Sequence, residues 1–257
     1  MIYGLYLSAT GVMTNSYRQD VIANNIANAE TVGFKKDLAL FDQRLTEAQY
    51  RRLSAGGPLS PTNKLLENLG GGLLAHPTAV DTGQGEFEPT GSPLDVAIEG
   101  EGFFAVDAGG ETRLTRNGQF EVDSTGRLAL SNAKGEQVLD VEQKPIQLEP
   151  GGNVWVGKDG TVTQHGRPVA RLGVFDVADR TKLTKQGGTL IRYGAQDLRP
   201  AAAATLHNEA VERANVDPAT ELAALMDTQR QLEANANMIR YQDQTLAKLV
   251  NEVGKIG

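Results

Sequence analysis

The sequence contains no cysteine, and only 5% of its residues are aromatic. The absence of cysteine excludes disulfides, thiolate chemistry and metal sites built on thiolates. No apolar run approaches the roughly 20 residues that span a bilayer. The first basic residue is Arg18, so no charged leader precedes an apolar run. We therefore expect neither membrane insertion nor a cleaved signal peptide.

Basic residues are not concentrated anywhere in the chain. Lys and Arg number 25 against 32 Asp and Glu, which gives a net charge of −7. The basic residues are scattered and do not form the stripe that binding to phosphates requires. Nucleic acid is therefore not an expected partner. With 40% apolar residues among 257, the chain still has enough material for a core.

Motifs that carry chemistry are also missing. No GxxxxGK[ST], HExxH or GxSxG motif is present, and His76, His165 and His207 lie in separate segments without a second ligand at metal-binding spacing. The segment Gly100–Ala105 has the glycine spacing of a dinucleotide fingerprint. A strand pattern follows it where that fingerprint needs a helix, which favours a tight turn. We expect no catalytic residue, cofactor-binding residue, cofactor or metal site, and no enzyme activity.

The last 40 residues predict one long helix. Asp217 and Pro218 suit the N-cap and the first helical position. Two rows of residues then recur every seven positions. The first row is Leu225, Leu232, Ile239, Leu246 and Val253, and the second is Leu222, Gln229, Ala236, Asp243 and Val250. A helix from Pro218 to Val253 would be about 54 Å long, so we expect it to need a partner along its length. The polar members Gln229 and Asp243 either fix its alignment or face water.

The first 30 residues predict a second, less apolar helix. Its stripe consists of Ile2, Leu5, Ala9, Val12, Ser16, Gln19, Ala23 and Ile26. Gly4 and Gly11 weaken it as an isolated helix. Asn24 and Asn28 share one face, where they either fix register against a neighbour or belong to an ordinary exposed last turn.

A helix end is predicted a few residues further on. Gly33 suits the left-handed position that ends a helix, and Phe34 is placed to fold back on the last turn. Lys35 and Lys36 would then lie near the negative end of the helix dipole.

The middle of the chain has a different composition. Between Ser54 and Pro93, 13 of 40 residues are Gly or Pro, which is typical of a linker or an extended arm. From Leu94 to about Tyr193 the apolar period changes to two. The predicted strands are Leu94–Glu99, Phe103–Asp107, Thr112–Arg116, Gln119–Val122, Arg127–Leu130, Asn153–Val156, Thr161–Gln164 and Val169–Val177.

These patterns predict an α+β fold in which the two terminal helices pair antiparallel as a coiled-coil-like stem and the middle forms an all-β domain. The expected organisation is an N-terminal helical stem at residues 1–36, a Gly/Pro-rich arm and linker at 37–93, a central β-domain at 94–200 and a C-terminal helical stem at 201–257.

Three parts of the sequence resemble the flagellar rod and hook family of axial proteins. They are Asn25-Ile26-Ala27-Asn28-Ala29-Glu30-Thr31-Val32-Gly33-Phe34-Lys35, the pair Leu94–Phe104 and Thr115-Arg116-Asn117-Gly118, and Ala214-Asn215-Val216-Asp217-Pro218 with Glu221-Leu222 and Gln229-Arg230. They occur in the family's order, and the distal and proximal rod proteins are the most similar members. The arm at Ser54–Gly72 matches neither of these two.

The resemblance implies a structural subunit of the bacterial flagellar basal-body rod. Such subunits pass through the flagellar type III export apparatus and stack helically around a central channel, with their terminal helices innermost. The implied partners are other copies of the chain, neighbouring rod and hook subunits, the export apparatus and bushing-ring proteins, and the implied location is the basal body across the periplasm. The expected assembly interface is Leu5, Val12, Asn24, Asn28, Gly33, Phe34, Leu222, Leu225, Gln229, Leu232, Ile239, Leu246 and Val253.

Three other functions are compatible with a helical stem and a β-domain. A hook-type axial subunit would carry an additional outer domain, for which a single modest β-domain leaves little room. A secreted adhesin or effector with a coiled-coil stalk would form a discrete oligomer. An enzyme acting on peptidoglycan would need a paired-acid or nucleophile motif, which the sequence does not offer.

Overall fold

The computed structural model describes residues 2–46, 49, 72–132, 134–149, 151–194, 198–201 and 204–253. Residues 54–71 of the predicted arm lie outside this described part. The chain divides into two compact units. We call residues 1–24, 39–78 and 219–257 the helical unit, and residues 25–38 and 79–218 the β unit.

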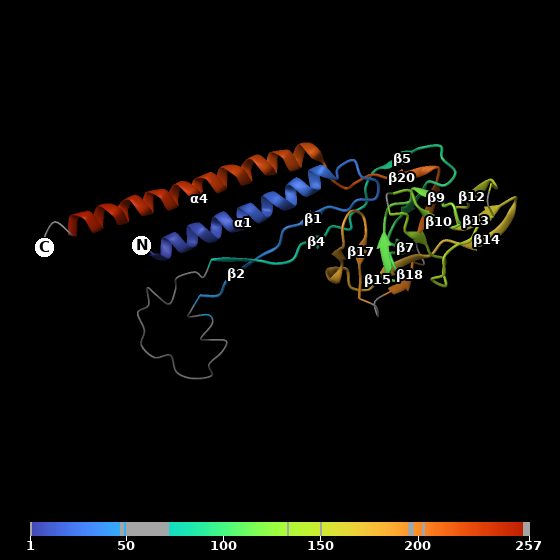
Figure 1. Cartoon of the computed structure of the whole chain (residues 1–257), viewed down its shortest axis with the longest axis horizontal. Helices are drawn as coiled ribbons and strands as arrows, with labels where there is room; N and C mark the ends of the chain where they lie inside the picture. The colour runs from blue at the N-terminus through green and yellow to red at the C-terminus, as the bar shows by residue number, and fades with distance from the viewer. Residues whose placement is uncertain are drawn as a thin grey trace, which may run out of the picture. The chain divides into compact units, whose positions relative to one another are not determined.

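The helical unit contains most of the two long helices, α1 (Ile2–Ala27) and α4 (Pro218–Val253). They lie side by side and run in opposite directions (Figure 1). Gly4 lies opposite Gln242 and Gly11 lies opposite Asn235, which confirms the antiparallel pairing. Because α4 begins directly after Asp217, its predicted start at Pro218 is also confirmed.

The two predicted rows of α4 differ in burial. The first-row side chains of Leu225, Leu232, Ile239 and Leu246 are partly buried. In the second row Leu222 and Val250 are 53% and 70% exposed, and Gln229 and Asp243 are exposed as well. The row that accompanies the leucines is instead Thr228, Asn235 and Gln242, which are buried or partly buried. Of the second row only Ala236 is partly buried, and of the two alternatives for Gln229 and Asp243 the structure shows the one in which they face water. Leu222 and Val250 were wrongly placed in the contact, because glycines of α1 face α4 and leave space for amides there.

Helix α1 ends earlier than predicted. It stops at Ala27, and the tighter bonds from Asn28 N to Asn25 O (3.2 Å) and from Ala29 N to Ile26 O (3.1 Å) close its last turn. Gly33 has the predicted left-handed conformation, with φ of 68°, but it lies six residues beyond the helix. The prediction that Gly33 is the residue that ends the helix was therefore wrong.

The residues predicted as an arm form short antiparallel ladders in each unit. In the β unit, β1 (Asp37–Leu38) pairs with β4 (Ala79–Val80). In the helical unit, β2 (Phe41–Gln43) pairs with β3 (Leu73–Ala75). The described part of the predicted arm thus contributes one such strand pair to each unit, β1 with β4 and β2 with β3.

The β unit is built from antiparallel sheets (Figure 1). The largest has nine strands, seven of them in the order β16-β17-β8-β7-β11-β10-β9, and β15 joins it by pairing with both β7 and β18. Its strands are β7 (Phe103–Asp107), β8 (Thr112–Thr115), β9 (Phe120–Val122), β10 (Leu128–Leu130), β11 (Gln137–Val138), β15 (Val174–Val177), β16 (Thr184–Lys185), β17 (Ile191–Arg192) and β18 (Leu198–Pro200). A short 3₁₀ helix, η1 (Arg180–Lys182), precedes β16.

Besides the β1–β4 pair, the described part of the β unit contains three smaller sheets. One has three strands, β12 (Val154–Val156), β13 (Thr161–Gln164) and β14 (Arg167–Arg171). Two others have two strands each, β6 (Val96–Glu99) with β19 (Thr205–Asn208) and β5 (Phe87–Pro89) with β20 (Ala210–Glu212).

Strand β7 is the centre of the apolar core. Successive side chains of a strand point to opposite faces of its sheet. Phe104 and Val106 belong to one buried cluster, and Phe103 and Ala105 belong to another. Because both faces are covered, the strand is apolar at four consecutive positions and does not alternate.

Most predicted strands are present, but Val169–Val177 is not a single strand. It is divided between β14 and β15, which belong to different sheets. The division is at Gly173, where a Cβ atom would lie 2.4 Å from the carbonyl oxygen of Asp140. Only glycine allows the chain to pass so close to another backbone segment.

Two further boundaries differ from the prediction. Residues 205–212, expected in the C-terminal stem, form β19 and β20 because β6 and β5 offer them a free edge. The tight turn predicted at Gly100–Gly102 is confirmed, since it connects β6 directly to β7 and both glycines have positive φ.

Candidate assembly site

The helical unit has very little apolar core. Among its described residues, Val21 and Ile22 are the only apolar side chains that are buried. The buried polar residues there are Ser8, Thr14, Asn15 and Thr228. Thr14 donates to the carbonyl of Thr10 (3.0 Å) and Thr228 donates to that of Ala224 (2.7 Å), so these hydroxyls are bonded within their own helices.

The residues of the predicted assembly interface fall into two groups. Leu5, Val12 and the first row of α4 are partly buried, while Asn24, Leu222 and Gln229 are exposed. The side chain of Val253 is outside the described part. Asn28 is partly buried and its Oδ1 accepts a bond from Thr31 (3.3 Å). Gly33 and Phe34 are buried inside the β unit, so the structure contradicts a surface role for them.

Phe34 belongs to a small cluster in the β unit. It packs with Ala29 and Val216, and it is 1% exposed. The ammonium of Lys185 lies 3.5 Å from the centre of its ring and 2.9 Å from the carboxylate of Asp37. Burial lowers the pKa of Lys185, and the bond to Asp37 opposes that shift. The aromatic ring therefore forms part of an ion-pair site.

Two asparagine side chains, one near the end of α1 and one just before α4, form hydrogen bonds with backbone groups of the β unit. Asn25 donates to the carbonyl of Asp37 and accepts from its backbone N–H, both at 2.9 Å. Asn215 accepts from the N–H of Lys36 (2.7 Å) and donates to the carbonyl of Asp81 (3.0 Å). Each amide takes the place of a strand neighbour, because it offers one donor and one acceptor.

The most buried polar site is a cluster of three charged side chains, which we call the charge cluster. It consists of Lys35, Arg116 and Glu212, whose side chains are 1%, 3% and 0% exposed. One carboxylate oxygen of Glu212 lies 2.5 Å from Lys35 Nζ, and the other lies 3.0 Å from Arg116 Nη1. The cluster brings together the segment after α1, the end of β8 and strand β20.

Backbone groups bond most of the remaining polar atoms of the cluster, whereas Nε of Arg116 is buried without a hydrogen-bond partner. Lys35 Nζ also donates to Gly83 O (2.7 Å), and Arg116 donates to Ile98 O (3.1 Å) and Gly100 O (2.6 Å). The N–H of Gly85 donates to Glu212 (2.8 Å). Burial lowers the pKa of Lys35 and Glu212 opposes this shift, so the carboxylate favours the charged form of the buried ammonium.

Gly33 lies beside this cluster, where the backbone segments come very close. Its N–H donates to the carbonyl of Glu212 (2.7 Å). A Cβ atom at Gly33 would lie 2.2 Å from the backbone nitrogen of Asn117, and its φ of +68° also disfavours other residues. Glycine is therefore required here on two grounds, its conformation and the lack of space.

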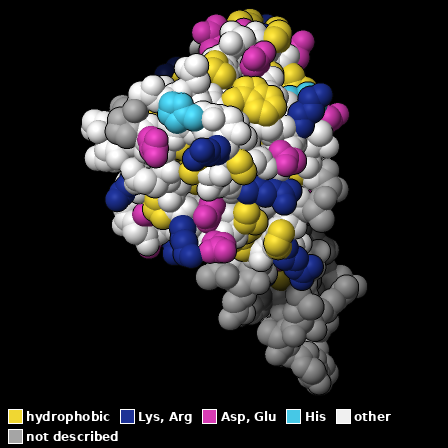
Figure 2. Space-filling model, turned by 90° about the vertical axis from the view of Figure 1, so that its right-hand side faces the viewer, with side chains coloured by type: hydrophobic (Ala, Val, Ile, Leu, Met, Phe, Trp, Pro, Cys, Tyr) yellow, Lys and Arg dark blue, Asp and Glu magenta, His cyan; other side chains and the backbone are white. Residues whose placement is uncertain are grey.

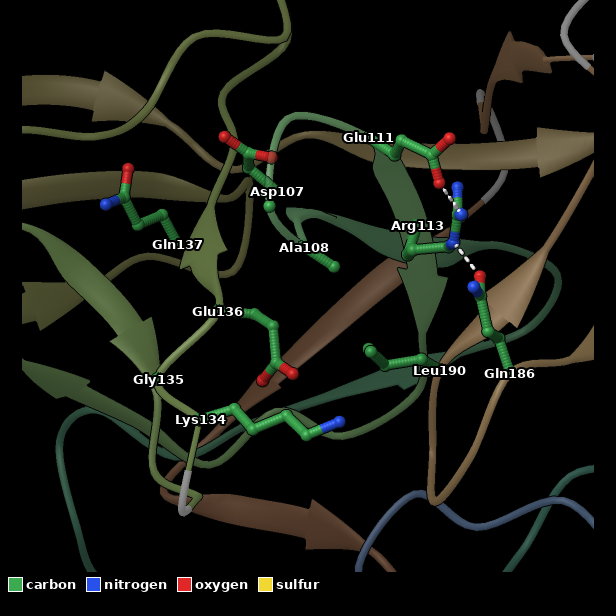
Figure 3. Close-up of a pocket in the computed structure, with 11 residues that line it drawn as sticks. Asp107, Ala108, Glu111, Arg113, Lys134, Gly135, Glu136, Gln137, Gln186 and Leu190 are labelled. Atoms are coloured by element: carbon green, nitrogen blue, oxygen red, sulfur yellow. Dashed lines mark hydrogen bonds and ion pairs between the residues drawn. The ribbon is translucent and has the colours of Figure 1, made fainter.

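A polar pocket of about 460 Å³ lies elsewhere in the β unit. Figure 3 shows Arg113 between Glu111 and Gln186, to which it donates hydrogen bonds. Arg113 also donates to the backbone carbonyl of Thr112 (3.1 Å). The bond to Gln186 connects β8 to the hairpin β16–β17. The guanidinium of Arg113 is therefore bonded within the fold.

The surface of the β unit carries charges of both signs. On the face shown in Figure 2, Lys and Arg side chains are interspersed with Asp and Glu, and hydrophobic side chains lie between them. Among the described residues no group of three or more His, Cys, Asp or Glu is placed to hold a metal ion. Neither described helix is long and apolar enough to cross a membrane.

Sequence reasoning found some of these residues but not their roles. Lys35 was predicted near a helix dipole, and Arg116 and Asn215 were noted only within similar motifs. Glu212 carried no signal, because its partners are 177 and 96 residues away in the chain. Asn25, which is 2% exposed, is not among the residues of the predicted assembly interface, which includes Asn24 and Asn28.

Comparison with known proteins gives matches along the chain. Residues 5–35 match the family "Flagella basal body rod protein", residues 97–164 the "Flagellar hook protein FlgE/F/G D1 domain", and residues 207–252 the "Flagellar basal body rod FlgEFG protein C-terminal" family. The charge cluster takes one residue from each of these three matches.

Similar full-length proteins are found in several bacteria. The chain is 34% identical to the flagellar basal-body rod protein FlgF of Caulobacter vibrioides, over 98% of each chain. It is 31% identical to FlgG of Bacillus subtilis, over 98% of this chain and 99% of that protein. It is also 31% identical to FlgF of Rhizobium meliloti, over 98% of each chain.

The close approach at Gly33 predicts a loss of stability in Gly33→Ala. The matched control is Gly109→Ala, because Gly109 has a similar φ of +74° but open space around it. The control should lose about 1–2 kcal/mol from its left-handed conformation alone, and Gly33→Ala should lose at least about 2 kcal/mol more. Urea unfolding followed by the fluorescence of Trp155, the single tryptophan, measures both. Equal losses would show that the space at Gly33 is not limiting.

The charge cluster predicts a large effect for Glu212→Gln. This change leaves Lys35 and Arg116 buried without their counter-charge, which should cost about 3–5 kcal/mol of unfolding free energy. Glu88→Gln is the control, because Glu88 is an exposed partner of Arg213 at 3.6 Å and should lose less than about 1 kcal/mol. The same fluorescence titration compares them. A loss in Glu212→Gln no larger than in Glu88→Gln would contradict this account of the cluster.

Proposed function

The chain belongs to the flagellar basal-body rod protein family, and we propose that its subunits polymerise helically into the drive shaft through their terminal helices. It is a structural rod subunit of the bacterial flagellar basal body that assembles with neighbouring rod and hook subunits. The proposal concerns which surface does this, and it rests on the near absence of a core in the helical unit.

The helical unit cannot gain much stability from its own apolar contacts. Ordering a residue costs about 1–2 kcal/mol of backbone entropy, and burying a large apolar side chain returns about 1.5–3 kcal/mol. Two helices of 26 and 36 residues are accompanied by only two buried apolar side chains among the described residues of the helical unit. Intrahelical hydrogen bonds and half-buried leucines leave such a pair marginal on its own.

Apolar side chains are instead left exposed on the two helices. They are Tyr6, Leu7 and Met13 on α1 and Leu222, Met226, Met238, Tyr241, Leu249 and Val250 on α4. Monomeric proteins seldom expose so much apolar surface on one element unless it is a binding surface. Neighbouring subunits would cover these side chains in a rod, so that polymerisation also completes folding.

The remaining features of the proposal come from the family resemblance. The helices form the wall of the central channel and the β unit forms an outer layer, where bushing-ring proteins would meet it. Helices that are only marginally stable in the free subunit suit passage through the flagellar export apparatus. This route needs no cleaved signal peptide, and it ends in a rod that spans the periplasm. The chain has a structural role and no enzyme activity.

Hydrogen exchange tests the marginal stability of the helices in the free subunit. In dilute, unassembled protein, the amides of residues 222–250 should exchange much faster than those of β7, because only the latter belong to a closed core. Assembly into rods should slow the exchange of residues 222–250. Strong protection of these residues in the free subunit would contradict the proposal.

Substitution of an exposed residue tests the surface itself. Leu222→Asp should block incorporation into rods, because it places a charge in a contact that neighbours must cover, while leaving the unfolding of the β unit unchanged. Val141→Asp is the control, since Val141 is a similarly exposed apolar residue of the β unit. Electron microscopy of basal bodies and Trp155 fluorescence provide the two measurements. Normal incorporation of Leu222→Asp would overturn the assignment of α4 as the contact surface.

A further inference from the structure

The contact between α1 and α4 repeats at an interval of seven residues. Gly4 and Gly11 of α1 are seven apart, and so are the residues opposite them on α4, Gln242 and Asn235. A Cβ atom at Gly4 would lie 2.8 Å from Nε2 of Gln242, and one at Gly11 would lie 2.7 Å from Nδ2 of Asn235. The end of each amide therefore lies in the notch left by the missing Cβ, and a larger residue at either glycine would displace it.

Glycine is an unfavourable choice inside a helix unless the notch is used. Each one lowers helix stability by about 1 kcal/mol relative to alanine. The same face of α1 carries Ser8 and Asn15, which are buried, so the surroundings of the notches are polar. An amide packed in this way contributes little to stability, since Oε1 of Gln242 is buried without a hydrogen-bond partner, but it can select one alignment, as a single buried asparagine does in a coiled coil.

We infer that Gly4, Gly11, Asn235 and Gln242 determine the register of the helix pair. A shift by one heptad would put Gly11 opposite Thr228, or Gly4 opposite Leu249, so at most one of the two notches would still hold an amide. A shift of three residues would leave both notches without an amide, and a shift of four would place at most one there, Gln231 opposite Gly11. Leucine rows, by contrast, would match again after every shift of seven residues. The glycine and amide pairs thus set which apolar side chains of α1 and α4 lie at the same level.

Disulfide trapping measures this register, because the natural chain has no cysteine. Gly11→Cys with Asn235→Cys removes the first notch and reports the observed alignment as the second notch, Gly4 with Gln242, selects it alone, since a Cβ at Gly11 would lie 3.0 Å from Cγ of Asn235. Gly11→Cys with Thr228→Cys reports an alignment shifted by one heptad. Both are made in the full chain and oxidised at low concentration, and non-reducing gels separate internal crosslinks from dimers. The pair at 11 and 235 should form about tenfold faster or more, and equal rates for the two pairs would overturn the inference.

Two changes at the second notch separate register from helix stability. Gln242→Leu should reduce the preference for the pair at 11 and 235 and raise trapping at 11 and 228. Gly4→Ala should also reduce that preference, although alanine strengthens an isolated helix. Increased trapping at 11 and 235 in Gly4→Ala would overturn the inference, as would an unchanged preference in Gln242→Leu.

The fluorescence of Trp155 verifies that the β unit of each variant is folded. All measurements use unassembled chains. A failure of the register inference is therefore distinguishable from a failure of the proposed polymerisation, which is measured on rods.

Discussion

The ion pairs of the buried Glu212 carboxylate are the interactions that hold the first and last segments of the β unit in place. The carboxylate pairs with Lys35 and Arg116, and the backbone carbonyl of the same residue accepts the N–H of Gly33. A buried ion pair adds little net stability compared with an apolar contact, but removing one partner is costly. The cluster therefore acts chiefly as a constraint, because moving any one of the three segments away would leave a buried charge without its partner.

The two units of the chain are stabilised in different ways. The β unit has a closed apolar core around Phe103 and Phe104 of β7, and its terminal segments are attached by charges and amides. The helical unit has a polar contact between its helices and carries apolar side chains on its exposed surface. The first arrangement is complete within one chain. The second leaves its largest stabilising term, apolar burial, to contacts with other subunits.

This division suits a protein that must exist both free and assembled. A helical unit with a strong core of its own would fold early and offer neighbours little apolar surface. A polar contact with a defined alignment keeps the free chain soluble and still presents the same surface each time. Different residues thereby provide the two properties. The glycines and amides determine the alignment of the helix pair, and the exposed leucines and methionines provide stability when neighbouring subunits cover them.

Much of the architecture could be predicted from the residues alone. The start of α4 followed from Asp217 and Pro218, and the strands β7 and β13 were predicted to the residue. The two helices and the all-β middle followed from periods of seven and two, which depend only on nearby residues. The turn at Gly100–Gly102 followed from the strands on either side.

What could not be predicted depended on contacts between distant segments. Residues 205–212 have no local strand signal that outweighs their polar composition, and only the free edges of β5 and β6 make them strands. The seven-residue pattern of α4 identified its leucine row, but the accompanying row was decided by where the glycines of α1 lie. The role of Glu212 could not be predicted from the sequence for the same reason, because its partners are distant in the chain. Local order is encoded in neighbouring residues, whereas burial and charge pairing exist only after the chain has brought residues 35, 116 and 212 together.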